Sequence, residues 1–172
     1  MSSTRLHFLA VLACLAVGAA ATAADAQRQG EVARRGAEGM PFELARTTHV
    51  FTKTDHGGTQ RVIAKDMADA GQVRLVREHL HEIQVQFRRG DFSGPARIHG
   101  ADMPGLAELK GAAPGAVSVD YADVAGGAEL RFASQDARLV QALHRWFDAQ
   151  LSDHGHDAVE GHAHHHMSGD MH

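Results

Sequence analysis

Histidines crowd the C-terminal end of the chain in a pattern typical of metal capture. Half of the 14 histidines lie in DHGHDAVEGHAHHHMSGDMH, residues 153–172, with acidic residues and two methionines between them. Imidazole is largely neutral above a pH of about 6.5, and several imidazoles on one flexible segment can surround a single ion. The Irving–Williams order favours Cu(II), then Ni(II) or Zn(II). The expected ligands of this tail are His154, His156, His162, His164, His165, His166 and His172. The alternative is a solvated low-complexity tail with no selected ligand.

A second set of ligand types lies in one loop rich in glycine and proline. His99, Asp102 and Met103 fall within IHGADMPG and bring an imidazole, a carboxylate and a thioether close together. With His79 from the preceding helix, they are candidates for an ordered site that holds a metal or a small ligand. The alternative is structural. Asp102 then caps a short helix in the same loop, Met103 packs inward, and His79 is a hydrogen-bonded histidine at the edge of the core.

Motifs for catalysis are few. A small enzyme or ligand-binding domain would draw on His79, His99, Asp102 and His144. The pair His79 and His81 lacks the spacing of the HExxH zinc motif, which places two histidines one helical turn apart. The serines lack a GxSxG context, so nucleophilic catalysis has little support. The sequence also contains no Walker loop, no dinucleotide fingerprint and no CxxCH haem motif.

The N-terminal residues predict export. Residues 1–26 begin with Arg5, continue as an apolar run from Leu6 to Ala21, and end in Ala-Asp-Ala, which suits cleavage after Ala26. The apolar run is shorter than the roughly 20 residues of a membrane span, so we expect a cleaved signal peptide and no stable membrane span afterwards. The only cysteine leaves with this peptide. The expected location of the mature protein is the periplasm or the medium.

The charge balance argues against nucleic acid as a partner. The formal net charge is -4, and no stretch concentrates lysine and arginine into the basic face that such binding requires. The expected partners are metal ions, and the sequence does not indicate a protein partner.

Alternating apolar residues around glycine pairs predict two β-hairpins. The glycines of DHGG and AGG permit tight turns, and the expected strands are residues 49–53, 59–64, 117–121 and 129–133. A helix follows each hairpin, at about residues 69–89 and 135–152, with apolar residues at helical spacing. The first stripe contains Val73, Val76, Leu80, Ile83 and Phe87, and the second contains Leu139, Leu143, Phe147 and Leu151. Asp136 lies where a carboxylate favours the start of the second helix.

These elements predict an α+β fold built from two ββα repeats. Neither repeat can bury its apolar face alone, so we expect one four-stranded antiparallel sheet with two helices on one face. The domain is expected over residues 48–152, with repeats at 48–89 and 117–152 and an ordered linker at 90–116 that holds a short helix near 104–110. A flexible leader at 27–47 and a disordered tail at 153–172 flank the domain.

Most of the domain resembles a family of small exported bacterial proteins. The similar stretches are MPFELARTTHVFTKTDHGGTQRVIAKD, RLVREHL, FRRGDFSGPARIHGADMPGL and RWFDAQLSDHG. Members of this family are often labelled aspartate carbamoyltransferase. That label implies a larger cytoplasmic two-domain enzyme with a serine-threonine-arginine phosphate loop. The nearest residues here, Ala45-Arg46-Thr47-Thr48, lack that pattern, so no activity and no catalytic residue is transferred to this chain.

Three functions follow as hypotheses. The leading one is a periplasmic protein that binds Cu, Zn or Ni as a buffer or chaperone, chiefly through its histidine-rich tail. The second is a small enzyme or ligand-binding domain that uses the loop from His99 to Met103 with His79 and His144. The third is an interaction module that docks another envelope protein.

Overall fold

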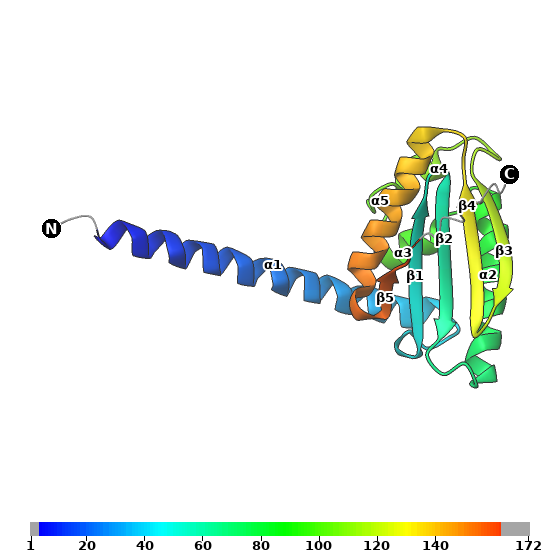
Figure 1. Ribbon diagram of the computed structural model, residues 1–172, viewed down its shortest axis with the longest axis horizontal. Coiled ribbons are helices and arrows are strands. Elements are labelled where there is room, and N and C mark those ends of the chain that lie inside the picture. Colours follow the sequence, from blue (N-terminus) through cyan, green and yellow to red (C-terminus); the bar gives the residue numbers. More distant parts are fainter. Residues whose placement is uncertain (1–3, 163–172) are drawn as a thin grey trace, which may run out of the picture.

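A mixed five-stranded sheet lies at the centre of the computed structural model, which describes residues 4–162, with side chains from Thr22 onward. The strand order is β3-β4-β2-β1-β5, and helices cover one face of this sheet (Figure 1). The strands are β1 (Thr47–Thr54), β2 (Gly57–Ala64), β3 (Ser118–Val124), β4 (Gly127–Ala133) and β5 (Ala158–Glu160). The helices are α1 (Thr4–Gly39), α2 (Ala70–Arg88), α3 (Ser93–His99), α4 (Leu106–Lys110) and α5 (Ala137–His154). The α+β class expected from the sequence is therefore confirmed.

Both predicted hairpins form, and the glycines explain how they pack. β1 pairs antiparallel with β2, and β3 does so with β4. Gly126 has φ +72° in the turn between β3 and β4, a conformation that side chains disfavour. Gly58 lies so close to α5 that a Cβ atom there would stand 2.6 Å from the ring of Phe147. The absence of a side chain thus lets the helix approach the sheet.

The two long helices begin at aspartate caps and bury apolar stripes. Asp69 accepts the backbone N–H of Gln72 at 3.1 Å, and Asp136 accepts that of Arg138 at 2.9 Å. The stripes meet the sheet in a core rich in aromatic rings, and its largest fully buried side chains are Trp146, Phe51, Phe132 and Phe147. This packing fixes the side chains of both helices relative to the sheet.

The expected four-stranded antiparallel sheet with two helices is corrected by further elements. β5 adds a short strand parallel to β1, with His49 opposite Ala158. The chain reaches this position because Gly155, with φ +54°, ends α5 and a 3-10 turn at Gly155–Asp157 redirects the backbone. A second 3-10 turn, Leu44–Arg46, leads into β1. The tail expected from residue 153 therefore starts later, since residues 153–160 belong to α5, the turn and β5.

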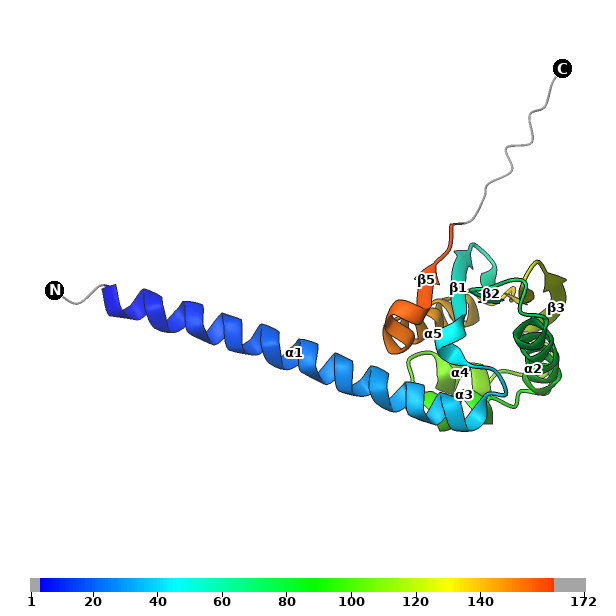
Figure 2. The ribbon, with the colours of Figure 1, turned by 90° about the horizontal axis from the view of Figure 1, so that it is seen from below.

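The segment expected to be a flexible leader is also structured. α1 continues to Gly39, where it packs on α3 and α5, and the side chains of Val32 and Phe42 are buried (Figure 2). The ion pairs of Arg34 with Glu38 and of Arg35 with Glu31 follow the helical i,i+4 spacing. This part of α1 buries Val32 against the domain and carries charged residues on its outer face, which is the pattern of an amphipathic helix.

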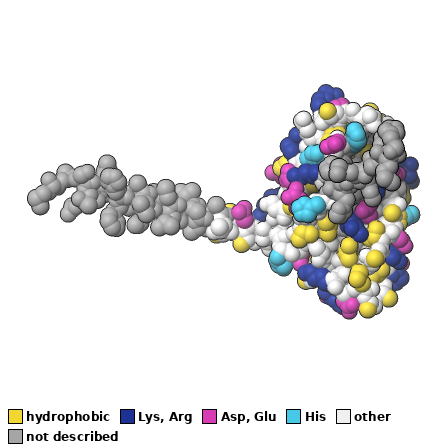
Figure 3. Space-filling view, viewed as in Figure 1, with side chains coloured by type: hydrophobic (Ala, Val, Ile, Leu, Met, Phe, Trp, Pro, Cys, Tyr) yellow, Lys and Arg dark blue, Asp and Glu magenta, His cyan; other side chains and the backbone are white. Residues whose placement is uncertain are grey.

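The linker expected at 90–116 holds two short helices rather than one. α3 was not predicted, and α4 begins at Leu106 with Gly105, rather than an acidic residue, at its N-cap. The sheet face without helices presents apolar and charged side chains side by side (Figure 3). Among the helices that the structure describes, none has the length and apolar character that a membrane span requires.

Candidate functional site

A pocket of about 440 Å³ lies on the helical side of the sheet, where elements from the whole chain converge. Its walls come from the C-terminal end of α1 and the residues after it, from β1, β2, α2 and α3, and from the end of α5. Phe42, Val62, Ile83 and Phe87 supply apolar surface. Pockets that bind small molecules measure roughly 300–1,000 Å³ and are mostly apolar with a few placed polar groups. This pocket therefore has the size and lining of a ligand site.

Four histidines reach the pocket from four different elements. His49 comes from β1, His79 from α2, His99 from α3 and His154 from α5. The ring of His49 stacks on that of His154, with centroids 4.5 Å apart and planes at 29°. His154 in turn meets His99 edge-on at 5.1 Å. Three imidazoles thus form one continuous group at the pocket wall, while the ring of His79 packs edge-on against Phe42 at 5.5 Å.

His49 is the unusual member of this group. Its side chain is 3% exposed, and neither ring nitrogen has a hydrogen-bond partner among the described residues. Burial, reinforced by the neighbouring imidazoles of His154, His99 and His79, holds the pKa of His49 well below its usual value. The ring is therefore neutral near neutral pH, and it offers one donor and one acceptor that the fold leaves unused.

Gln150 adds a second unused polar group to the pocket. Its amide nitrogen is buried and has no partner within residues 22–162, although the side chain lines the pocket. An unmade hydrogen bond at a buried polar group costs about 1–3 kcal/mol. Native folds rarely leave several such groups together unless water or a ligand completes them. His49 and Gln150 therefore point to an occupant.

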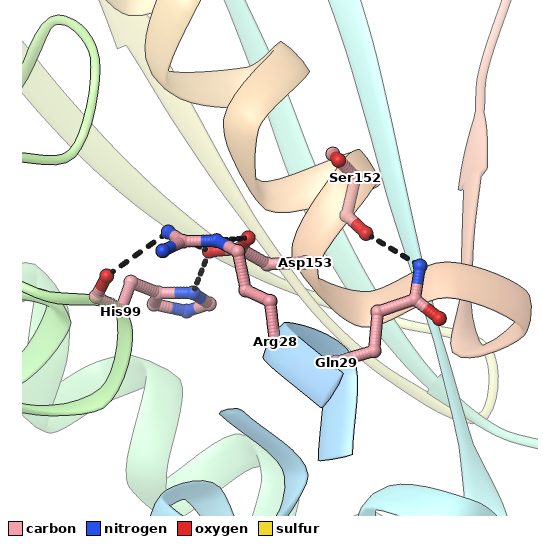
Figure 4. A network of polar contacts seen from close by, with 5 residues as sticks. All are labelled: Arg28, Gln29, His99, Ser152 and Asp153. Carbon is pink, nitrogen blue, oxygen red and sulfur yellow. Dashed lines mark hydrogen bonds and ion pairs between the residues drawn. The ribbon is translucent and has the colours of Figure 1, made fainter. Parts of the chain in front are cut away.

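His99 is held by a charged network that joins α1, α3 and α5 (Figure 4). Its Nδ1 lies 2.9 Å from Oδ2 of Asp153, and both side chains are almost fully buried. Arg28 donates through Nε to Oδ1 and through Nη2 to Oδ2 at 3.0 Å, and Nη2 also reaches the carbonyl oxygen of His99 at 3.1 Å. Beside them, the side-chain amide of Gln29 donates to the carbonyl oxygen of Ser152 at 2.9 Å.

The ionisation states follow from this network. Burial alone would raise the pKa of the Asp153 carboxyl, but the hydrogen bonds from His99 and Arg28 outweigh burial and lower it. Asp153 is therefore an anion whose charge is matched inside the protein. Burial, together with the nearby His99, lowers the pKa of His154 to about 4, so His154 is neutral at neutral pH.

The residues predicted to carry function are only partly brought together. His79 and His99 both line the pocket, as their joint assignment to one site requires. Met103 is buried in the core and Asp102 is exposed, so neither joins them. Met103 packs inward, as in the structural alternative, and the N-cap position of α4 is occupied by Gly105 rather than by Asp102. His144 lies elsewhere, where its Nε2 contacts the carbonyl oxygens of Thr54 at 3.1 Å and Gly57 at 2.9 Å.

The expected ligands of the tail separate into three groups. His154 belongs to α5 and is buried, because α5 extends two residues further than predicted. His156 and His162 are exposed. Four lie outside the described residues, namely His164, His165, His166 and His172. Within the described residues, no three histidine, aspartate or glutamate side chains are arranged to hold one metal ion.

Sequence reasoning missed His49, Gln150, Asp153 and Arg28 as parts of a site. Two periodic signals were available. His49 alternates with Phe51 along a strand, which places both on the same buried face. His154 follows Leu143 and Phe147 at helical spacing, which continues the buried stripe of α5. Nothing in the sequence indicates that Arg28 meets Asp153, since they lie 125 positions apart.

Comparisons with known proteins identify no relative, because no family model, curated protein or solved structure matches the chain.

Proposed function

We propose that this domain binds a small neutral organic molecule in the histidine-lined pocket. The observation that carries the proposal is His49, a buried imidazole on the pocket wall whose two nitrogens lack partners among the described residues. Gln150 supports it with an unpartnered amide nitrogen. An occupant with both donors and acceptors would satisfy these groups and remove their desolvation cost.

The charges of the site favour a neutral occupant. Asp153, the buried carboxylate nearest to the pocket, is already paired with Arg28 and His99. His49 and His154 are neutral near neutral pH, because burial lowers the pKa of both. A charged group placed among them would lose its hydration without a free partner of opposite charge. The charged residues of the pocket lining, Glu38, Glu82 and Arg97, are all exposed.

The apolar walls favour a flat or compact frame. Phe42, Phe87 and Ile83 line the same space as the histidines. Small heterocycles with a lactam or amide group combine an apolar ring with one donor and one acceptor. 2-Pyridone, nicotinamide and benzamide are therefore suitable probes of the proposed function.

Nuclear magnetic resonance of histidine-labelled protein tests this proposal directly. Addition of 2-pyridone, nicotinamide or benzamide is expected to shift the ring resonances of His49 with saturation, since its nitrogens gain partners. The His49→Phe variant should lose the binding, whereas His144→Gln should keep it because His144 lies away from the pocket. The proposal fails if none of the three probes perturbs His49 or His154 up to its solubility limit.

We also propose that the chain is exported and that its histidine-rich end binds Cu(II), Ni(II) or Zn(II). Composition supports this second function, together with the exposure of His156, whose side chain is 88% exposed. His154 is buried in α5, so the described ligands of this second function are the exposed His156 and His162, and neither lines the pocket. Cleavage after Ala26 would leave the part of α1 that packs on the domain attached to the mature chain.

A further inference from the structure

The contact between His99 and Asp153 fixes which nitrogen of His99 is free. Asp153 is ionised and can only accept hydrogen bonds, so the Nδ1 of His99 donates to it across 2.9 Å. In the tautomer that donates from Nδ1, the lone pair of the ring lies on Nε2. No described residue forms a hydrogen bond to Nε2, and the side chain of His99 lines the pocket. Nε2 is thus the ring nitrogen of His99 that Asp153 leaves free.

Arg28 holds both members of this pair in place. Its guanidinium binds the two carboxylate oxygens of Asp153 and the carbonyl oxygen of His99 at once. Three contacts from one planar group fix the carboxylate relative to the imidazole. Figure 4 shows the arrangement, with Arg28 from α1, His99 from α3 and Asp153 from the end of α5. The pair is thereby held rigidly by three separate helices.

A carboxylate behind an imidazole favours proton uptake at the far nitrogen. When Nε2 accepts a proton, the ring becomes a cation, and the anion of Asp153 stabilises it from the other side. The neighbouring rings of His154 and His49 are neutral, so they do not oppose this charge as protonated rings would. An ion pair between Arg28 and Asp153 could stabilise the fold without His99. The presence of an imidazole bonded to the same carboxylate therefore favours a role in proton transfer.

We infer that His99 is a general base acting on the molecule in the pocket, with Asp153 as its positioning residue. This inference rests on the proposed binding function. The substrate class is a small neutral molecule with an acidified C–H bond, such as one next to a carbonyl group. Nε2 takes the proton, and the electron pair of the C–H bond stays on the substrate as an enolate, whose negative charge is balanced by the imidazolium formed beside it. The imidazolium then returns the proton to the substrate, so the net reaction is a tautomerisation or an isomerisation without a co-reactant.

A neutral probe can report this base chemistry without knowledge of the natural substrate. 5-Nitrobenzisoxazole is flat and uncharged, and a base that removes its C–H proton drives cleavage of its N–O bond. The electron pair of the C–H bond forms the nitrile, and the oxygen leaves as a coloured phenolate. The full chain is expected to catalyse this elimination with saturation, faster than free imidazole at the same concentration.

Matched variants separate catalysis from structure. His99→Gln keeps a donor toward Asp153 and should lower the rate by about 100-fold or more. Asp153→Asn should lower the rate and move its acid inflection to lower pH, because the anion that favours protonation of the ring is lost. His144→Gln should leave the rate unchanged, since its ring contacts only backbone carbonyls outside the pocket. Circular dichroism confirms that each variant is folded.

The outcomes are distinguishable from those of the binding experiment. Wild-type turnover in His99→Gln, or a wild-type rate no faster than free imidazole, overturns the assignment of the base. If His99→Gln does not fold, an unshifted pH profile in Asp153→Asn overturns it instead. Binding of 2-pyridone, nicotinamide or benzamide without turnover of the benzisoxazole leaves the proposed binding function standing and refutes catalysis. Absence of both binding and turnover refutes both.

Discussion

The buried neutral histidines make the fold sensitive to mild acid. In the unfolded chain His49 and His154 bind protons with a pKa of about 6.5. In the folded chain burial lowers the pKa of His154 to about 4 and that of His49 well below its usual value. The unfolded state therefore binds more protons below pH 6.5, and the free energy of unfolding must fall as the pH falls through this window.

The magnitude follows from the size of the pKa shifts. Each imidazole that is protonated only in the unfolded state removes about 1.4 kcal/mol per pH unit. His154 alone accounts for about 3 kcal/mol between pH 6.5 and its pKa of about 4. His49 acts over the same window, and His79 adds to the effect because burial also lowers its pKa. The loss is large against the total stability of roughly 5–15 kcal/mol that is typical of small domains.

Urea unfolding between pH 7.5 and 4.5 at constant ionic strength measures this slope. The single tryptophan, Trp146, is buried in the core and reports unfolding by fluorescence. His49→Phe removes one titrating ring but keeps an aromatic ring against His154, so its slope should be smaller by about 1.4 kcal/mol per pH unit. Val119→Ala is the control, because it weakens the core at every pH and leaves the slope unchanged.

The titration stops at pH 4.5 so that protonation of carboxylates does not contribute to the measured slope. Hydrogen bonds lower the pKa values of Asp91 and Asp136, and those from His99 and Arg28 lower that of Asp153 against the effect of burial. Such groups stabilise the fold above their unfolded pKa of about 3.9, and this stabilisation is lost only at lower pH. Stability that stays constant from pH 7 to 5, or an identical slope in His49→Phe, would refute the neutral, buried state of these rings.

Three further predictions concern the contact of Arg28 with Asp153, which we call the clamp, the packed Gly105, and the histidine-rich tail. Arg28→Gln should lower the free energy of unfolding by about 2 kcal/mol at pH 7 in urea titrations, because the buried carboxylate of Asp153 loses its cation. The loss is smaller than for a fully buried ion pair, since the side chain of Arg28 is 48% exposed. An unchanged midpoint would contradict this clamp. Gly105→Ala should lower the free energy of unfolding by more than about 3 kcal/mol or prevent folding. Gly105 has φ +79°, and a Cβ atom there would lie 2.1 Å from the carbonyl oxygen of Ala142. A melting temperature close to that of the wild type would contradict this packing. A chain that ends at His162 should retain no Cu(II), Ni(II) or Zn(II) after dialysis, whereas the full chain retains it, and metal analysis of both checks the proposal for the tail.

Local patterns predicted the central part of the fold correctly. The glycine pairs located both hairpins, and Asp69 and Asp136 are the caps at which α2 and α5 begin. These features depend on neighbouring residues, so they can be recognised in a single sequence. The additional elements could not be recognised in this way. β5 is only three residues long, and its strand form depends on β1 beside it rather than on its own composition.

The candidate site was less predictable because it is assembled from distant segments. His79 and His99 were identified by residue type, but their shared pocket depends on how α2 and α3 are placed by the rest of the fold. The ring of His154 was assigned to the tail because the surrounding sequence is rich in glycine and histidine. A polar sequence context outweighed the helical spacing that places this ring on the buried face of α5.

The position of Arg28 has a practical consequence for anyone who prepares this protein. If processing removes residues 1–26, Arg28, which binds Asp153, is the second residue of the mature chain. Removal of two further residues would delete it. Preparations that differ by so little at their amino end would then differ in acid tolerance and in pocket chemistry. Mass spectrometry of the intact chain should therefore precede every functional assay.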